Sequence, residues 1–66
     1  MKLVHLLNAE TQEFEWINVN SIGRFWASKN RSEAAGGQSN TIIEFRHSGA
    51  FEVEYEINPY ELSAQL

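Results

Sequence analysis

Residues 51–57, FEVEYEI, alternate strictly between apolar and acidic side chains. Because successive side chains of a β-strand point to opposite faces, this pattern predicts a strand with one core face and one solvent face. The core face carries Phe51, Val53, Tyr55 and Ile57. The other face carries a row of three carboxylates: Glu52, Glu54 and Glu56.

Five segments in all have the composition and alternation of strands, at residues 2–7, 13–19, 24–28, 41–47 and 50–57. In the first, both faces are apolar, with Leu3, His5 and Leu7 on one and Val4 and Leu6 on the other. Such a pattern is typical of a strand covered on both sides or lying inside a small barrel. In the second segment, Phe14 and Trp16 share one face, and Ile17 and Val19 share the other.

The connections between these segments carry recognisable turn and helix signals. Asn20, Ser21 and Gly23 favour a turn or a single helical turn that packs Ile22 inward. Residues 29–40 contain Gly36-Gly37 and lack apolar periodicity, which predicts a long flexible loop. At the end of the chain, an Asn-Pro-x-Glu sequence at 58–61 predicts a capped helix of about two turns that docks on the sheet through Leu62 and Leu66.

The last two strands are expected to form a hairpin whose register follows from its loop. A three-residue loop, His47-Ser48-Gly49, places Gly49 at a left-handed position and keeps apolar residues on one face. It pairs Phe45 with Phe51, Ile43 with Val53 and Thr41 with Tyr55. The same register sets Glu44 directly opposite Glu52 and Ile42 opposite Glu54, and two facing carboxylates repel each other.

These elements predict a mainly β (α+β) fold, formed by a small curved antiparallel sheet or barrel of about five strands with a short C-terminal helix. Residues 1–66 are expected to form a single small domain. A chain of this length buries only about 60% of its unfolded surface, so its stability is marginal without further support. The chain has no cysteine, which leaves oligomerisation as the expected support.

Composition narrows the classes of function. The net charge is −4 and all nine acidic residues are glutamate, which argues against direct nucleic-acid binding, although Arg24, Lys29 and Arg31 could form a small anion-binding cluster. His5 and His47 stand alone, and no phosphate-binding glycine motif is present, so we expect no enzyme, no cofactor and no metal site. The N-terminal apolar run is too short for a secretory signal or a membrane span, which predicts a cytoplasmic protein without membrane contact.

Two surfaces are candidates for binding another protein. Alternate residues of a strand lie about 6.7 Å apart, so the carboxylates of Glu44, Glu52, Glu54 and Glu56 would form a regular row that imitates nucleic-acid phosphates. The simpler interpretation is that these charges keep an edge strand from aggregating. The second candidate is an interface that uses Trp16 or Trp26. A single-sided sheet cannot bury every aromatic residue, so either the sheet curls into a barrel or another chain covers part of this surface, and exposed tryptophans are common interface anchors.

The chain also resembles the short bacterial flagellar FlbD-like proteins. The matching positions are Leu6–Asn8, Ile17-Asn18, Ile22, Thr41–Phe45, Gly49 and Leu62, in a strand, helical turn, hairpin and C-terminal helix. The segment 29–40 is longer than in that pattern, and its Pro-Asp turn before the hairpin is missing. The resemblance implies a small non-enzymatic β protein, and no functional residues are transferred from it.

Together these observations predict a small protein-binding module, such as a phage or mobile-element inhibitor whose acidic strand face occupies the groove of a nucleic-acid-handling enzyme. The alternative is a structural or regulatory adaptor that works as a homodimer or larger homo-oligomer through an aromatic interface. The two differ in salt dependence, because an electrostatic mimic loses affinity steeply as salt rises and an aromatic interface does not.

Overall fold

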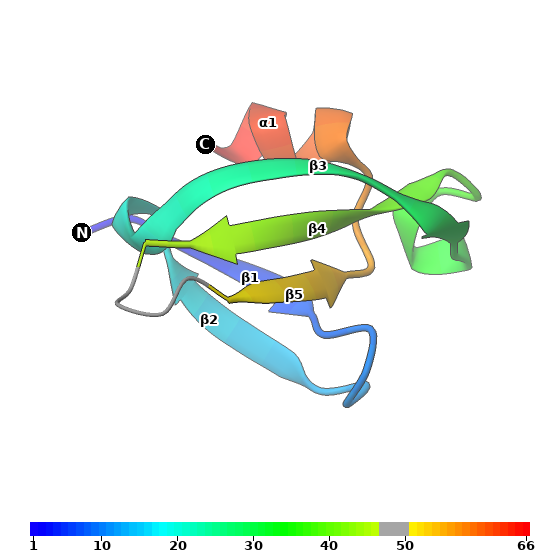
Figure 1. Ribbon diagram of the computed structural model, residues 1–66, viewed down its shortest axis with the longest axis horizontal. Helices are drawn as coiled ribbons and strands as arrows, with labels where there is room; N and C mark the ends of the chain where they lie inside the picture. Colours follow the sequence, from blue (N-terminus) through cyan, green and yellow to red (C-terminus); the bar gives the residue numbers. More distant parts are fainter. Residues whose placement is uncertain (47–50) are drawn as a thin grey trace.

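Five antiparallel strands form two sheets around a shared core (Figure 1). The computed structural model describes residues 1–46 and 51–66. Along the chain its elements are β1 (Leu3–Leu7), β2 (Phe14–Asn18), the 3-10 turn η1 (Val19–Ser21), β3 (Ile22–Arg31), the 3-10 turn η2 (Glu33–Ala35), β4 (Ser39–Phe45), β5 (Glu52–Tyr55) and α1 (Pro59–Gln65).

The first sheet consists of β1 and β2, and the second has the strand order β3-β4-β5. A single bridge between Asn8 and Tyr55 joins them, flanked by backbone hydrogen bonds of 2.9 Å from Ala9 N–H to the Glu54 carbonyl and from Glu56 N–H to the Leu7 carbonyl. The mainly β fold with five antiparallel strands and a C-terminal helix is therefore confirmed. Within the described ranges the strands form two sheets that do not close into a barrel.

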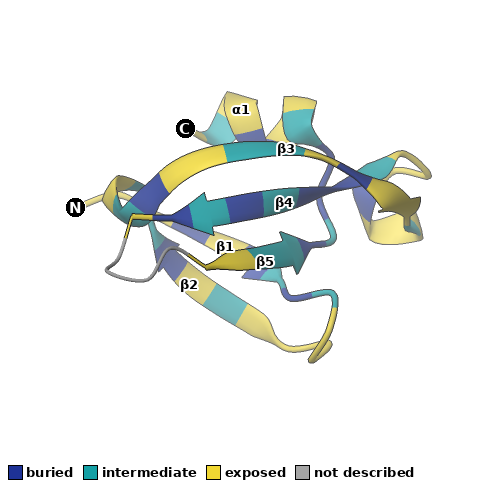
Figure 2. Ribbon diagram, viewed as in Figure 1, coloured by how far each residue is buried: buried dark blue, intermediate teal, exposed yellow. Residues whose placement is uncertain are grey.

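The core lies between the inner faces of the two sheets (Figure 2). Alternation along each strand selects its buried side chains, as expected for strands with one covered face. The core residues are Val4, Leu6, Ile17, Ile22, Ile43, Phe45, Tyr55, Ile57 and Leu62. Ile22 points inward directly after the 3-10 turn η1, as the turn residues predict.

The predicted register of the β4–β5 hairpin is confirmed. Thr41 pairs with Tyr55, Ile43 with Val53, and Glu44 with Glu52. The N–H of Phe45 donates to the carbonyl of Phe51 at 3.1 Å, which extends the same register by one pair. The loop predicted at His47-Ser48-Gly49 lies outside the described residues.

The loop predicted over residues 29–40 is wrong in its bounds, because strands occupy both of its ends. β3 continues to Arg31, which pairs with Ser39 at the start of β4 after a register shift. The turn between them is closed by Ser32, whose Oγ accepts from the N–H of Ala35 at 3.3 Å, and by Gly36 and Gly37 with φ of 71° and 75°. This segment is ordered by local hydrogen bonds between polar side chains and the backbone, which a search for apolar alternation does not detect.

The C-terminal helix begins where its capping residue predicts. Asn58 Oδ1 accepts from the N–H of Glu61 at 2.8 Å, and its Nδ2 donates to the carbonyl of Ala35 at 3.2 Å. Leu62 is fully buried in the core, and α1 lies beside β3 (Figure 1). Packing, rather than length, therefore stabilises this seven-residue helix.

Candidate functional site

One face of the β1–β2 hairpin is apolar and points away from the core. It comprises Leu3, His5 and Leu7 from β1 and Phe14 and Trp16 from β2, and we call it the aromatic face. Cross-strand pairing sets His5 beside Trp16 and Leu7 beside Phe14. The His5 ring stacks on the Trp16 ring, with centroids 4.3 Å apart, and lies 4.8 Å from the Phe14 ring.

This face is exposed to solvent. Trp16 is 68% exposed, Phe14 62% and Leu3 47%. The expectation that β1 is covered on both sides is therefore wrong: Val4 and Leu6 are buried, whereas Leu3 and His5 on the opposite face are exposed. A contiguous apolar patch of this kind is typical of a site where another molecule binds.

The turn between the two strands holds the aromatic face in place. Asn8 Oδ1 accepts from the backbone N–H groups of Glu10 at 2.8 Å and Thr11 at 3.1 Å. Gln12 adopts a left-handed conformation with φ of 62°, and its N–H donates to the carbonyl of Asn8 at 2.9 Å. The turn is stabilised by the Asn8 side chain and reverses the chain direction. All five residues of β2 therefore pair with β1.

The opposite side of the hairpin is fixed to the second sheet by a polar contact. Tyr55 is 2% exposed, and its hydroxyl donates to Glu15 Oε1 at 2.7 Å. Asn8 Nδ2 donates to the other oxygen, Oε2, at 3.0 Å. Burial, together with the hydrogen bond and negative charge of Glu15, raises the pKa of Tyr55 well above its usual range. The hairpin is thus held rigidly on its inner side while its outer side stays exposed.

A groove of about 320 Å³ runs along β2 on the side of β5. Its apolar lining includes Trp16 and Ile17 from β2 and Phe51 and Val53 on the opposite wall. Glu15 and Tyr55 lie on its lining as well. The groove therefore adjoins the aromatic face and shares Trp16 with it.

Trp26, the second predicted interface residue, lies on the other sheet. It pairs with Ile42 and is half-buried, with the Arg24 guanidinium carbon 5.3 Å from its ring centroid. This cation–π contact covers part of the indole. The structure therefore does not bring Trp16 and Trp26 together on one surface.

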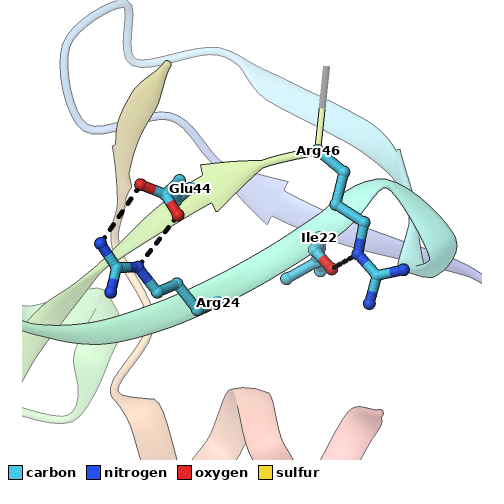
Figure 3. Close-up of polar contacts among 4 residues, drawn as sticks. All are labelled: Ile22, Arg24, Glu44 and Arg46. Carbon is cyan, nitrogen blue, oxygen red and sulfur yellow. Dashed lines mark hydrogen bonds and ion pairs between the residues drawn. The ribbon is translucent and has the colours of Figure 1, made fainter. Parts of the chain in front are cut away.

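The predicted acidic row is interrupted by partners from the protein itself. Glu44 Oε1 pairs with Arg24 Nε at 2.9 Å on the exposed face of the second sheet (Figure 3). Glu56 lies beyond the end of β5 and accepts a hydrogen bond from Gln12 Nε2. Glu52 is exposed, opposite Glu44.

Glu54 has the most extensive set of partners. Its carboxylate accepts from Ser28 Oγ at 2.9 Å, from Asn40 Nδ2 at 2.9 Å and from Asn30 Nδ2 at 3.2 Å. The hydrogen bond from Asn40, followed by those from Ser28 and Asn30, lowers the pKa of Glu54 despite partial desolvation. Ser28 and Asn40 are buried polar residues, so this carboxylate satisfies donors that would otherwise lack partners.

Among residues 1–46 and 51–66, no three metal-ligating side chains come together. No helix in this part of the chain has the length and apolar character needed to cross a membrane.

Comparisons with known protein families, curated proteins and solved structures give no relative from which a function could be inferred. No protein-family model matches the chain, nor does any curated protein or solved structure. The resemblance to FlbD-like proteins stays a prediction.

Sequence reasoning selected Trp16 but missed His5, Leu3 and Phe14 as its neighbours on one exposed face. The predicted pattern sets His5 on one strand face with Leu3 and Leu7, and Phe14 on one face with Trp16, but it does not say that these two faces are exposed together. The available signal was the two-sided apolar pattern of residues 2–7, which also fits a strand whose outer face binds a partner.

Proposed function

We propose that this protein is a small non-enzymatic binding module that acts through the aromatic face of its β1–β2 hairpin. The observation that carries the proposal is the exposure of Phe14 and Trp16 on a rigid hairpin whose inner side is already fixed by Glu15 and Tyr55. Rigid aromatic side chains lose little conformational entropy when they bind, which makes them effective interface anchors.

The acidic nucleic-acid mimic is less well supported by the geometry. A mimic needs carboxylates that are available to a partner, yet Glu44, Glu54 and Glu56 each have a partner within the protein. Glu54 in particular organises buried donors, which is a structural role. Inhibition of a nucleic-acid-handling enzyme through the acidic row therefore stays a prediction, and the aromatic face is the stronger candidate.

The experiment compares two surface variants of the full chain. In the first, Phe14→Ser and Trp16→Ser together remove the aromatic face. In the second, Tyr60→Ser removes an aromatic side chain on α1 that is 82% exposed, which makes it a matched control. Proteins retained by immobilised wild type are purified. The affinity of each retained protein for the wild type and for the variants is then measured by calorimetry.

We expect the aromatic-face variant to bind at least about tenfold more weakly, since loss of one interface anchor typically costs 2 kcal/mol or more. Tyr60→Ser should bind like the wild type. The proposal is overturned if the aromatic-face variant retains full affinity. Glu52→Lys is measured in the same way as a third variant, and a loss confined to it would transfer the function to the acidic row.

A further inference from the structure

The two outer strands of the paired sheets, β2 and β3, differ in how well their edges are protected. β3 has two register shifts in its pairing with β4, carries Arg24, Lys29 and Arg31, and is contacted by α1. Bulges, cationic side chains and covering elements are the usual means by which proteins prevent edge-to-edge association. The edge of β3 is therefore protected in three ways.

The edge of β2 has the opposite character. It is straight in register with β1 along all five residues, and its outward side chains are the uncharged Phe14, Trp16 and Asn18. An exposed, apolar, regularly paired edge is a template for pairing with another strand.

The hydrogen bonds at the two ends of the hairpin show which backbone groups of β2 point outward. Asn8 N–H donates to the Glu13 carbonyl at 2.9 Å, and Val19 N–H donates to the Lys2 carbonyl at 3.0 Å. Since hydrogen-bonded and non-hydrogen-bonded pairs alternate in an antiparallel ladder, Glu15 and Ile17 also direct their N–H and C=O groups toward β1. The backbone groups of residues 14, 16 and 18 therefore point away from β1, and among them the Asn18 carbonyl already accepts from Ser21 Oγ at 2.6 Å.

We propose that the partner at this edge is a second copy of the chain, with the two β2 strands paired antiparallel about a two-fold axis at Trp16. This inference rests on the proposed binding role of the aromatic face. The register joins the backbone of Trp16 to Trp16 of the partner subunit, and that of Phe14 to Asn18 of the partner subunit. A two-fold contact of this kind is closed, so it yields a dimer rather than a fibre.

The charges along β2 fit this register. Glu15 falls opposite Ile17 of the partner subunit, and Glu13 opposite Val19 of the partner subunit, so no like charges face each other directly. The Glu15 carboxylate is also held inward by Tyr55 and Asn8. Self-pairing therefore brings little electrostatic cost even though the chain has a net charge of −4.

The groove beside β2 lies next to the position that β2 of the second copy would occupy. Ile17 is buried in the core of its own subunit, so it is the edge of the partner's β2, rather than a side chain, that lies on the side of Phe51 and Val53. Both line the groove of about 320 Å³. Edge pairing thus covers an apolar groove as well as adding backbone hydrogen bonds.

The size of the contact predicts a reversible dimer. A standard interface buries about 800 Å² per partner, roughly a fifth of the 4340 Å² surface of this protein. The exposed parts of Phe14 and Trp16 together supply about 250 Å², and the groove and strand edge add to it. A contact below the standard size is typical of a weak, reversible association.

The test is sedimentation equilibrium of the full chain from about 1 µM to about 1 mM, the range in which weak dimers dissociate. Two variants probe the edge. The first is a chemically synthesised chain with N-methyl-tryptophan at position 16, which keeps the aromatic side chain but removes the outward backbone donor. The second is Trp16→Lys, which places like charges across the two-fold axis, and Tyr60→Lys is its control. Circular dichroism verifies that each variant is folded.

We expect the wild type and Tyr60→Lys to dimerise and both position-16 variants to be at least about tenfold weaker. A wild type that stays monomeric to 1 mM, or an N-methyl variant that dimerises normally, overturns the pairing of two β2 strands. The aromatic-face binding of a different protein is measured separately, with the Phe14→Ser, Trp16→Ser variant. The two proposals can therefore fail independently.

Discussion

The imidazole ring of His5 lies parallel to the indole ring of Trp16, with centroids 4.3 Å apart and planes inclined by 15°. The two residues are directly opposite in the β1–β2 ladder. Their stacking limits the orientation of the indole while leaving Trp16 mostly exposed. The protein therefore presents an ordered apolar side chain to solvent, which is characteristic of a preorganised binding surface.

The first prediction separates the aromatic face from the core. Trp16→Ala should lower the free energy of unfolding of the monomer by less than about 1 kcal/mol, because the side chain is exposed and leaves no internal cavity. Ile43→Ala, at a fully buried position, should cost about 2 to 5 kcal/mol. Urea unfolding followed by circular dichroism at low micromolar concentration measures both. A large loss for Trp16→Ala would assign that residue to the fold instead.

The second prediction concerns the contact that joins the two sheets. Tyr55→Phe should destabilise the protein by about 1 to 3 kcal/mol, because the partly buried carboxylate of Glu15 loses a donor at 2.7 Å. The effect should be much smaller if Glu15 is already replaced by Leu, which has no acceptor for the hydroxyl, and a double-mutant cycle measures this difference. Additive losses from the two substitutions would contradict direct coupling between these side chains.

The raised pKa of Tyr55 gives the same contact a pH dependence. In the folded protein the neutral phenol is favoured over the phenolate, so this contribution to stability is complete below the unfolded pKa of about 10 and is lost as pH rises above it. In a Tyr60→Phe variant Tyr55 is the remaining tyrosine. We expect its phenolate absorbance to develop only well above pH 10, together with unfolding. A normal titration in the folded protein would show that the phenol is accessible.

The third prediction concerns Glu54 and its donors. Glu54→Gln should lower stability by about 1 to 3 kcal/mol, because a side-chain amide cannot accept from Ser28, Asn30 and Asn40 as a carboxylate does. Since the folded pKa of Glu54 is lowered, its contribution is present above the unfolded value of about 4.3 and is lost as pH falls below it. Thermal melts from pH 7 to pH 3 should show a smaller acid-dependent decrease for Glu54→Gln than for wild type. Identical pH profiles would exclude this carboxylate as a source of acid sensitivity.

The fourth prediction uses the facing pair of Glu44 and Glu52. Glu52→Lys replaces two opposed like charges with an opposite pair and should stabilise the protein by about 0.5 kcal/mol at low salt. Glu52→Gln is the control and should give a smaller gain. Both gains should shrink in about 1 M NaCl, where the screening length falls to about 3 Å. Destabilisation by Glu52→Lys at low salt would mean that this carboxylate makes a favourable contact.

Reversing all three strand glutamates together would be a poor test of the acidic row. Lysine at position 54 would face the amides of Asn30 and Asn40, which donate to the native carboxylate. Loss of binding in such a variant would then report damage to the fold. Glu52→Lys alone changes the exposed charge and leaves the Glu54 network intact.

The hairpin register was predictable from the sequence because alternation and loop length act together at residues 41–57. The cap at Asn58 was predictable as well, since an Asn-Pro-x-Glu sequence has a local physical meaning. These features depend on residues that are near one another in the chain. Both are found in the structure, at Glu44 opposite Glu52 and at Asn58 bonded to Glu61.

The features that escaped prediction depend on contacts between distant segments. The exposure of Phe14 depends on which face of the β1–β2 hairpin the second sheet covers. The interruption of the acidic row depends on partners from neighbouring strands, such as Arg24 for Glu44. Glu54 looked like a solvent residue because its donors Ser28 and Asn40 are 26 and 14 residues away. Similarly, the extension of β3 to Arg31 follows a register shift, which a hydrophobic pattern does not encode.

The Asn8–Tyr55 bridge also has a consequence for the time course of folding. The β1–β2 and β4–β5 pairings are local hairpins, which form in about 1 to 10 µs. The junction between the sheets instead brings together Glu15 and Tyr55, which are 40 residues apart, and it must first overcome the entropy of closing that loop. We expect the joining of the two sheets, rather than either hairpin, to limit the folding rate, and substitutions at Tyr55 to slow refolding more than substitutions at Trp16.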